Sequence, residues 1–122
     1  MQEAIQLVPS DRAESLDFPW GGLVWYASGA LGNGADAVTV GRCLLKPGCS
    51  NPRHYHPNCA EILVVTQGRI RHTLSDKTET EMGPGDTVTI PANAWHQATN
   101  IGDTDALLFI VFTSPDRKTI GE

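Results

Sequence analysis

The sequence predicts an all-β sandwich or barrel, and three observations lead to this prediction. Short runs of β-branched and aromatic residues recur along the chain, for example at residues 62–66 and 106–113. Turn residues, mainly glycine, proline and asparagine, separate these runs, most clearly at residues 83–86. No segment has the apolar spacing that is typical of an amphipathic helix. The 122 residues are enough for one domain with one core.

The two ends of the chain are less regular than its middle. Residues 1–30 are expected to form an N-terminal arm and edge strands, because polar and apolar residues mix there without a clear period. Within them, residues 23–27 are aromatic and apolar between glycine-rich turns, which predicts one strand. The barrel itself is expected over residues 31–115, and a C-terminal tail over residues 116–122.

Within residues 31–115 we expect strands in steady alternation with turns. The strand at 38–46 ends at a proline-glycine pair, and the short extended segment at 53–56 is followed by a proline. The remaining expected strands, which alternate in polarity or are rich in β-branched residues, are 62–66, 69–74, 78–82, 87–90, 95–99 and 106–113. The intervening turns are expected at 75–77, 83–86 and 91–93.

Two of these strands, 62–66 and 106–113, are apolar on both faces. One face of the second carries Leu107, Phe109 and Val111, and its other face is equally apolar. A strand that is buried on both sides needs a second layer outside the barrel wall. A homodimer that packs sheet on sheet is the simplest source of that layer, and the alternative is that the N-terminal arm covers it.

Composition and charge exclude several classes of partner. The net charge of −5 argues against a nucleic-acid surface, which needs a basic stripe. No apolar run approaches the length of about 18 residues that a membrane helix needs. The cysteines, Cys43, Cys49 and Cys59, form no CxxC pair. An odd number of thiols without a visible export signal predicts reduced cysteines in the cytoplasm.

Three of the four histidines fall into a pattern with one glutamate. His54 and His56 lie two residues apart, so in a strand they project to the same side while Tyr55 points away. Glu61 follows after a turn and can return on the neighbouring strand, whereas His96 comes from a distant strand. Three neutral imidazoles and one carboxylate can bind a divalent metal and leave positions open for a small molecule.

The spacing of these residues resembles the two motifs of the cupin family. The first motif reads Gly48-x5-His54-x-His56-x4-Glu61-x6-Gly68, and the second reads Gly85-x5-Pro91-x-Asn93-x2-His96-x3-Asn100. The short gap between them is similar to that of small single-domain cupins. The second motif usually has glycine where this chain has Asn93, and asparagine also tolerates a left-handed backbone. The resemblance implies a double-stranded β-helix, or jelly-roll barrel, whose metal ligands are His54, His56, Glu61 and His96.

Manganese or iron is the expected metal, because a carboxylate oxygen and open octahedral positions suit these ions; cobalt, nickel, copper and zinc also fit the donor set. The resemblance implies an enzyme that acts on a small organic acid, sugar or phenolic by oxidation, decarboxylation, isomerisation or lyase chemistry. The alternatives are a metal-assisted binding or sensing module that does not transform its ligand, and a structural or storage protein.

Several other residues have two interpretations each. His72 is expected to face the barrel interior, either as a general base or hydrogen-bond donor to substrate, or as a packed histidine with a backbone or hydroxyl partner. Arg42 lies on an apolar face, where it can either bind a substrate carboxylate inside the barrel or extend to water. Cys59 is expected to pack rather than to react. Trp20 and Trp25 are expected to line the barrel mouth or to cover an edge.

Overall fold

The computed structural model describes residues 5–75 and 77–121, and over these residues the chain is built from strands. One 3-10 turn, Ser10–Arg12, precedes them. The strands are β1 (Glu14–Phe18), β2 (Gly21–Ala27), β3 (Thr39–Leu45), β4 (His54–Tyr55), β5 (Glu61–Gln67), β6 (Ile70–Thr73), β7 (Glu79–Met82), β8 (Thr87–Ile90), β9 (Gln97–Asn100), β10 (Ala106–Phe112) and β11 (Ile120–Gly121). Within the described residues there is no helix long and apolar enough to cross a membrane.

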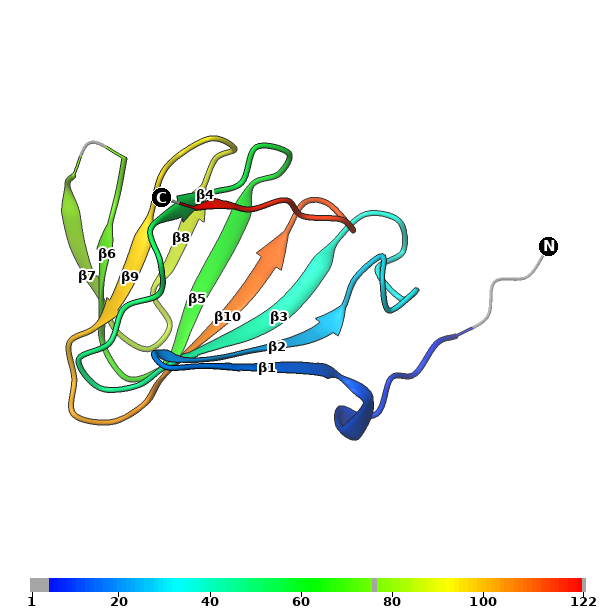
Figure 1. The fold of residues 1–122 in the computed structure, drawn as a ribbon, viewed down its shortest axis with the longest axis horizontal. Helices are drawn as coiled ribbons and strands as arrows, with labels where there is room; N and C mark the ends of the chain where they lie inside the picture. The colour runs from blue at the N-terminus through cyan, green and yellow to red at the C-terminus, as the bar shows by residue number, and fades with distance from the viewer. Residues whose placement is uncertain (1–4, 76, 122) are drawn as a thin grey trace.

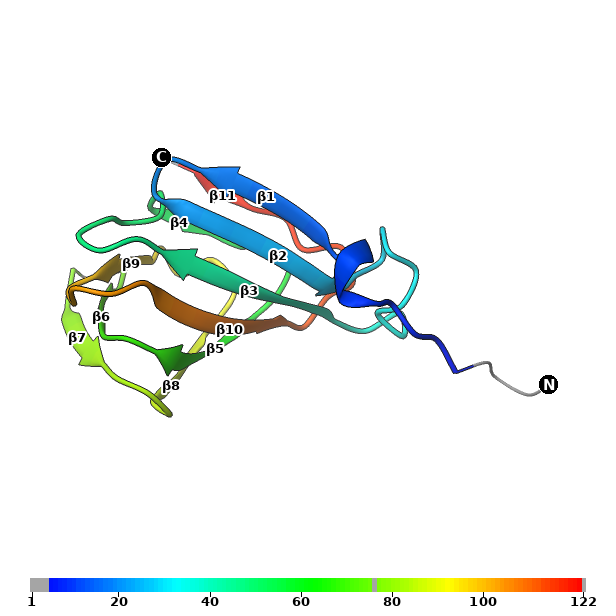
Figure 2. The ribbon, with the colours of Figure 1, turned by 90° about the horizontal axis from the view of Figure 1, so that it is seen from below.

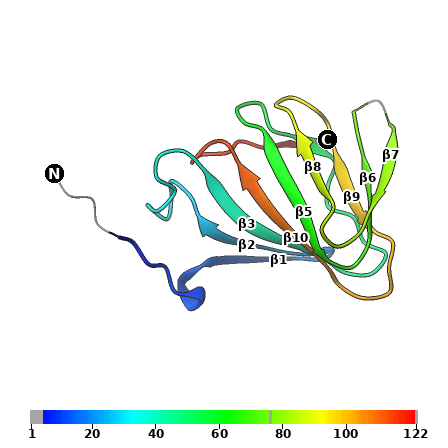
Figure 3. The ribbon, with the colours of Figure 1, turned by 180° about the vertical axis from the view of Figure 1, so that it is seen from behind.

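The strands form three antiparallel sheets that enclose one interior. The largest sheet has the order β1-β2-β3-β10-β5-β8, a second has the order β7-β6-β9, and β11 pairs with β4. Figures 1 and 3 show the large sheet as one continuous wall, with the three-stranded sheet beside β8 at one end of it. The non-consecutive order is that of a jelly-roll barrel, so the predicted fold class is confirmed.

The core follows from strict alternation along the central strands of the large sheet. In β3 and β10 every second residue is buried, and the buried sets start at Thr39 and at Ala106. Because β10 pairs with β3 on one side and with β5 on the other, the inward residues of the three strands form one layer. The largest fully buried apolar side chains of this layer are Leu45, Val65 and Leu108, and Ile70 of β6 joins them from the three-stranded sheet.

The turns also lie where the sequence predicts them. Asn93 has φ of 70°, the left-handed conformation that the cupin motif normally assigns to glycine. In the turn at 83–86, Asp86 N donates to the carbonyl of Gly83 at 3.0 Å and Gly85 has φ of 89°. In the turn at 75–77, Lys77 has φ of 68°, and Asp76 lies outside the described residues.

The outer face of the large sheet is apolar and open to solvent. Phe109 on β10 is 38% exposed and Ile62 on β5 is 37% exposed. The described part of the N-terminal arm, from residue 5 onward, does not cover them, since Ile5 and Leu7 are themselves exposed and this part extends away from the barrel (Figure 1). Figure 2 shows this face of β3 and β10 without a further layer of described chain over it. The alternative in which the arm supplies the second layer is therefore not seen for the described residues.

The C-terminal segment, expected as a tail over residues 116–122, takes part in the barrel over its described part, residues 116–121. Its strand β11 pairs with β4, with Ile120 opposite Tyr55 and Gly121 opposite His54. Asn58 Nδ2 also donates to the carbonyl of Asp116 at 2.8 Å. The segment thus lies against the part of the chain that carries His54 and His56.

Candidate metal centre

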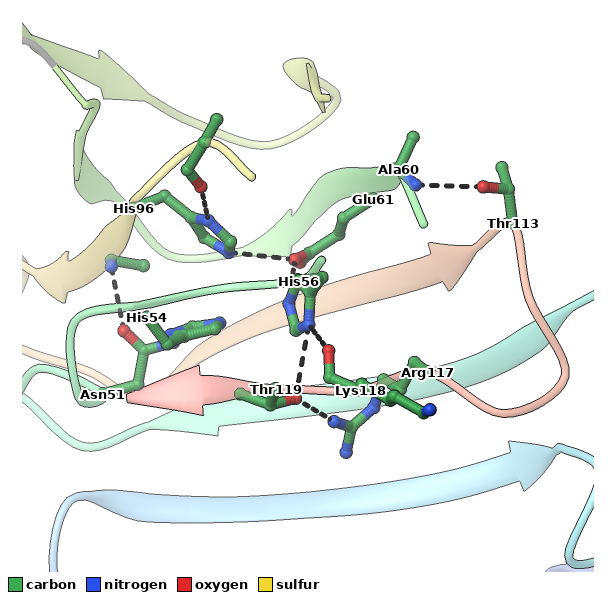
Figure 4. A network of polar contacts seen from close by, with 12 residues as sticks. Asn51, His54, His56, Ala60, Glu61, His96, Thr113, Arg117, Lys118 and Thr119 are labelled. Atoms are coloured by element: carbon green, nitrogen blue, oxygen red, sulfur yellow. Dashed lines mark hydrogen bonds and ion pairs between the residues drawn. The ribbon is translucent and has the colours of Figure 1, made fainter. Parts of the chain in front are cut away.

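Four side chains from separate parts of the chain gather in the barrel interior: His54, His56, Glu61 and His96 (Figure 4). Their potential ligand atoms all lie within 4.8 Å of one another. Two reciprocal backbone hydrogen bonds hold the distant segments together, from His54 N to the His96 carbonyl at 3.0 Å and from His96 N to the His54 carbonyl at 2.8 Å. His56, Glu61 and His96 are buried, and His54 is partly exposed.

Each of the three imidazoles is oriented by a backbone carbonyl. A carbonyl oxygen only accepts hydrogen bonds, so the ring nitrogen beside it, Nδ1, carries the hydrogen. The other nitrogen, Nε2, is then left with its lone pair directed at the centre of the cluster, as in metal-binding histidines. The three pairs are His54 Nδ1 with Pro52 O at 2.6 Å, His56 Nδ1 with Lys118 O at 2.9 Å, and His96 Nδ1 with Ala94 O at 3.0 Å.

Two of the free nitrogens point at the same carboxylate oxygen. His96 Nε2 lies 3.0 Å from Glu61 Oε1, and His56 Nε2 lies 3.2 Å from that same atom. A neutral imidazole nitrogen and a carboxylate oxygen are both acceptors, so this approach is unfavourable unless a cation or a proton lies between them. Three nitrogens and one oxygen, closely spaced and buried, are a donor set that fits a divalent transition metal.

The electrostatics of the metal-free cluster agree with this geometry. Burial alone raises the pKa of Glu61, but His56 and His96 in their protonated form donate to the carboxylate and attract it, which outweighs burial and lowers the pKa to about 2. Burial acts to lower the pKa of His96, but its contact with Glu61 raises it overall. Burial and the charge of His96 lower the pKa of His54 to about 4. Glu61 is therefore ionised and His54 neutral at pH 7.

A cavity of about 290 Å³ opens beside the cluster. His54, His56 and Glu61 form part of its wall. Its other walls are largely apolar, and a smaller polar part comes from residues that are not named positions of the two motifs as written above. The apolar part includes Phe18, Trp20, Leu23, Trp25, Leu63 and Phe112, and the polar part includes Asn51, Arg117 and Thr119. Both tryptophans, for which lining the barrel mouth was one expectation, line this cavity.

His72 lies in the interior, as expected, and the described residues offer it no backbone or hydroxyl partner. Its side chain is fully buried, and its ring centroid is 5.7 Å from that of His96. Neither ring nitrogen has a hydrogen-bond partner within the described part of the chain. Burial lowers the pKa of His72 to about 4, so the ring is neutral at pH 7. It is not among the residues that line the 290 Å³ cavity.

The interpretation of Arg42 as a residue inside the barrel is wrong. Arg42 lies between the buried residues Gly41 and Cys43 of β3, so its side chain leaves the sheet on the outer face. There it lines a separate surface cavity with Asp17 and Asp105. Both faces of β3 carry apolar residues, so the sequence pattern did not reveal which face is internal.

Cys43 and Cys59 have the properties of packed rather than reactive thiols. Burial raises the pKa of Cys43 to about 12, and burial and Glu61 raise the pKa of Cys59. A thiol that stays protonated is a poor nucleophile and a poor metal ligand.

Trp95, next to His96 in the chain, points away from the cluster and packs edge to face on Tyr55 at 4.7 Å between centroids.

Sequence reasoning missed Arg117, Thr119 and Asn51, which the structure places on the cavity wall. Thr119 Oγ1 lies 3.2 Å from His56 Nδ1 and accepts a hydrogen bond from Arg117 Nη1 at 2.6 Å (Figure 4). Asn51 Oδ1 accepts from Ala98 N at 2.9 Å, which ties the segment before His54 to β9. Isolated polar residues in loops carry no periodic signal, and only the pairing of β11 with β4 brings Arg117 and Thr119 here.

Comparison with known proteins gives a consistent result. A family model described as a cupin domain matches residues 41–112, which include all four residues of the cluster. The auxin-binding protein ABP19b of Prunus persica is 37% identical over 82 residues, 64% of this chain and 39% of that protein. The oxalate oxidase GF-3.8 of Triticum aestivum is 28% identical over 103 residues, 79% of this chain and 44% of that protein.

Among solved structures, the oxalate decarboxylase of Lactobacillus farciminis, in a formate complex, superposes with a TM-score of 0.83 at 22% identity. The superposition covers 91% of this chain and 34% of that one. At this identity the similarity establishes the fold. The chain spans about two-fifths of the length of the curated relatives that it matches.

Proposed function

The chain belongs to the cupin family, and on that premise we propose that it is a metal-dependent protein that acts on a small organic acid at the His54, His56, Glu61 and His96 cluster. The observation that carries the proposal is the approach of two histidine Nε2 atoms to one carboxylate oxygen at 3.0 and 3.2 Å. A divalent cation would replace the unfavourable contact between acceptors with a set of coordination bonds. Manganese or iron is favoured because of the carboxylate ligand.

The chain's own residues prepare the site for such chemistry. The carbonyls of Pro52, Lys118 and Ala94 hold the three rings in one tautomer, so little reorganisation is needed on binding. Glu61 supplies one negative charge to the cluster. When bound, the metal supplies Lewis acidity for a ligand oxygen, or redox chemistry in the case of iron or manganese. The adjoining apolar walls exclude water from the bound ligand.

The class of substrate is supported by the relatives named above, of which one is an oxalate oxidase and one an oxalate decarboxylase. Both of these proteins carry names that state action on a small carboxylic acid. The proposed reaction is an oxidation, a decarboxylation, an isomerisation or a lyase reaction. A sensing module is the second candidate, because the same centre can bind an acid without converting it.

Metal binding provides the direct test. We expect the reconstituted protein to bind one divalent ion per chain, measured by elemental analysis and by calorimetric titration with Mn²⁺. His54→Ala removes one of four donors, so we expect it to lose the ion. His72→Leu, a change at an interior histidine outside the cluster, should retain it. A reconstituted wild-type protein without a bound ion would contradict the proposal, and turnover of candidate acids by the loaded protein would separate an enzyme from a sensor.

We also propose a homodimer that buries the outer face of the large sheet. The exposed Phe109 and Ile62 lie on neighbouring strands of that face, and the described part of the N-terminal arm leaves them open. We expect the wild-type protein to be a dimer by light scattering on a size-exclusion column and Phe109→Lys to be a monomer, because a charge at a buried apolar contact is unfavourable. Leu7→Lys in the arm is the matched control. A dimeric Phe109→Lys or a monomeric wild-type protein would show that this face is not the interface.

A further inference from the structure

The cavity beside the cluster contains more apolar surface than metal binding alone requires. Phe18 and Trp20 are stacked with their ring planes 2° apart and centroids at 4.8 Å, and both face this cavity. Leu23 and Leu63 add aliphatic surface to the same cavity. Ligand pockets of this kind bind the apolar part of a molecule by excluding water and orient it through a few polar groups. The volume of about 290 Å³ suits a body of about one aromatic ring with a short substituent.

One fixed positive charge lies on the same wall. The guanidinium carbon of Arg117 is 4.1 Å from the centroid of the Trp25 ring and 5.3 Å from that of Phe112. Trp25 reaches this position because Gly41 has no side chain; a Cβ there would lie 2.4 Å from the Trp25 ring. Arg117 Nη1 donates to Thr119 Oγ1 at 2.6 Å, which fixes the end of the side chain beside His56 (Figure 4).

Arg117 has more hydrogen-bond donors than its contact with Thr119 uses. A guanidinium carries five N–H groups, and the Thr119 contact uses one of them. Among the described residues no carboxylate forms an ion pair with Arg117, whereas the surface residues Arg69 and Arg71 pair with Glu81 and Glu79. The charges of Glu61 and Glu14 act on Arg117 without a direct ion pair. A partly buried guanidinium that is held against aromatic rings and forms no direct ion pair is a typical binding site for a carboxylate.

We infer that the ligand of this cavity is an aromatic monocarboxylic acid, with its carboxylate on Arg117 and its ring between Trp20 and Leu23. The inference rests on the proposed metal function above, because Arg117 and the cluster share one cavity and a ligand oxygen can face the metal. Oxalate, the acid named for two of the relatives, has no apolar part and leaves most of this wall without a contact. Arg117 is thus a specificity-determining residue, and it comes from outside the two cupin motifs.

Four probe molecules separate the contributions of charge and ring. Cinnamate has both, cinnamamide has the same shape without the charge, acetate has only the carboxylate, and oxalate has two carboxylates and no ring. Binding is measured by calorimetry and by quenching of tryptophan fluorescence, with Mn²⁺-loaded and metal-free protein in parallel. We expect cinnamate to bind at least about tenfold more tightly than each of the other three, since a charge-assisted bidentate contact and a buried ring each contribute on this scale.

Variants of Arg117 then test whether this residue provides the positive charge that binds the carboxylate of cinnamate. Arg117→Met retains an unbranched side chain that can pack on Trp25, and we expect it to lose the preference for cinnamate over cinnamamide while cinnamamide binding is unchanged. Arg117→Lys restores part of the preference, since it keeps the charge without the planar fork. Trp20→Ala should weaken cinnamate and cinnamamide by equal factors. Thermal unfolding of each variant checks that the fold is retained.

Three outcomes would overturn the inference, and a fourth would overturn the proposed metal function instead. Equal weakening of cinnamate and cinnamamide by Arg117→Met would show that the arginine has a structural role only. Oxalate or acetate binding as tightly as cinnamate would show that the ring site is not used. No binding of cinnamate to metal-loaded protein would refute the ligand class and leave the metal result standing. Cinnamate binding to a protein that takes up no metal would instead refute the metal function and keep the ligand class.

Discussion

Glu61→Gln is expected to reduce the affinity for a divalent metal by at least about 100-fold, or about 2.7 kcal/mol. The amide keeps the size of the side chain but removes the only negative charge of the four-residue cluster. The amide also replaces one acceptor oxygen with an NH2 donor, and in one of the two orientations of the side chain this donor faces the cluster. The measurement is a calorimetric titration with Mn²⁺ on protein that has first been stripped with a chelator.

The same variant has a second readout in the metal-free protein. Contact with Glu61 raises the pKa of His96 against the opposing effect of burial, so without the carboxylate that pKa should fall below the ordinary histidine value. Proton NMR titration of the imidazole resonances follows this change directly. Glu79→Gln, at an exposed ion pair with Arg71 on the three-stranded sheet, is a matched control that should alter neither quantity. Unchanged metal affinity in Glu61→Gln would mean that the carboxylate is not a ligand.

The sequence predicts the metal cluster because its determinants are local and periodic. His54 and His56 lie on one side because alternate residues of an extended chain share a face, and the turn before β5 returns Glu61 beside them. His96 is a longer-range prediction that depends on the family motif. Asn93, with φ of 70°, shows that the turn before His96 keeps its backbone conformation with asparagine in place of glycine.

The cavity wall is less predictable, because it depends on sheet register and on one short pairing. β3 has small and apolar residues on its inner face and Val40 and Leu44 on its outer face, so hydrophobicity alone does not orient Arg42. The two-residue strand β11 has no periodic pattern, yet it carries the Lys118 carbonyl and Thr119 to His56. The sequence does not show which backbone carbonyl will bind a histidine ring, since every residue has a carbonyl.

The expected arginine and the observed one differ for the same reason. One of the two interpretations of Arg42 placed an arginine inside the barrel on a long regular strand, whereas the arginine on the cavity wall is Arg117, from an irregular segment. The environment of Arg117 depends on Trp25 and Phe112, which come from β2 and β10 at opposite ends of the sequence. Only the folded barrel places these rings together, so the ligand specificity inferred above is a property of the tertiary structure.

Acidification should destabilise the metal-free protein in a defined window. His72 and His54 have a pKa of about 4 in the folded state, mainly because of burial, against an ordinary value of 6.5. Between these values the unfolded chain binds protons that the folded chain does not, so the free energy of unfolding falls as the pH decreases from 6.5 to 4. The fully buried His72 alone accounts for a loss of about 3 kcal/mol.

Two further titrating groups, His96 and Glu61, also make the free energy of unfolding depend on pH. The raised pKa of His96 acts in the opposite direction, so its contribution to stability is complete below its ordinary pKa and is lost as the pH rises through the folded value. Glu61, with its pKa lowered to about 2, stabilises the fold above its ordinary value of 4.5 and loses this contribution as the pH falls through 2. Urea unfolding of chelator-treated protein between pH 7 and pH 4 measures the balance of these contributions.

His72→Leu isolates the contribution of the fully buried histidine. Leucine removes the titrating group and the two ring nitrogens that lack partners in the described part of the chain, so we expect a protein that is more stable at pH 7 by about 1–3 kcal/mol. Its decrease in stability between pH 6.5 and pH 4 should be smaller than that of the wild type by a similar amount. A variant that is less stable at pH 7, or that keeps the full pH dependence, would show that His72 is hydrogen-bonded in solution. In that case the residue would regain its place as a candidate general base, because a partner at either nitrogen would fix its tautomer beside His96.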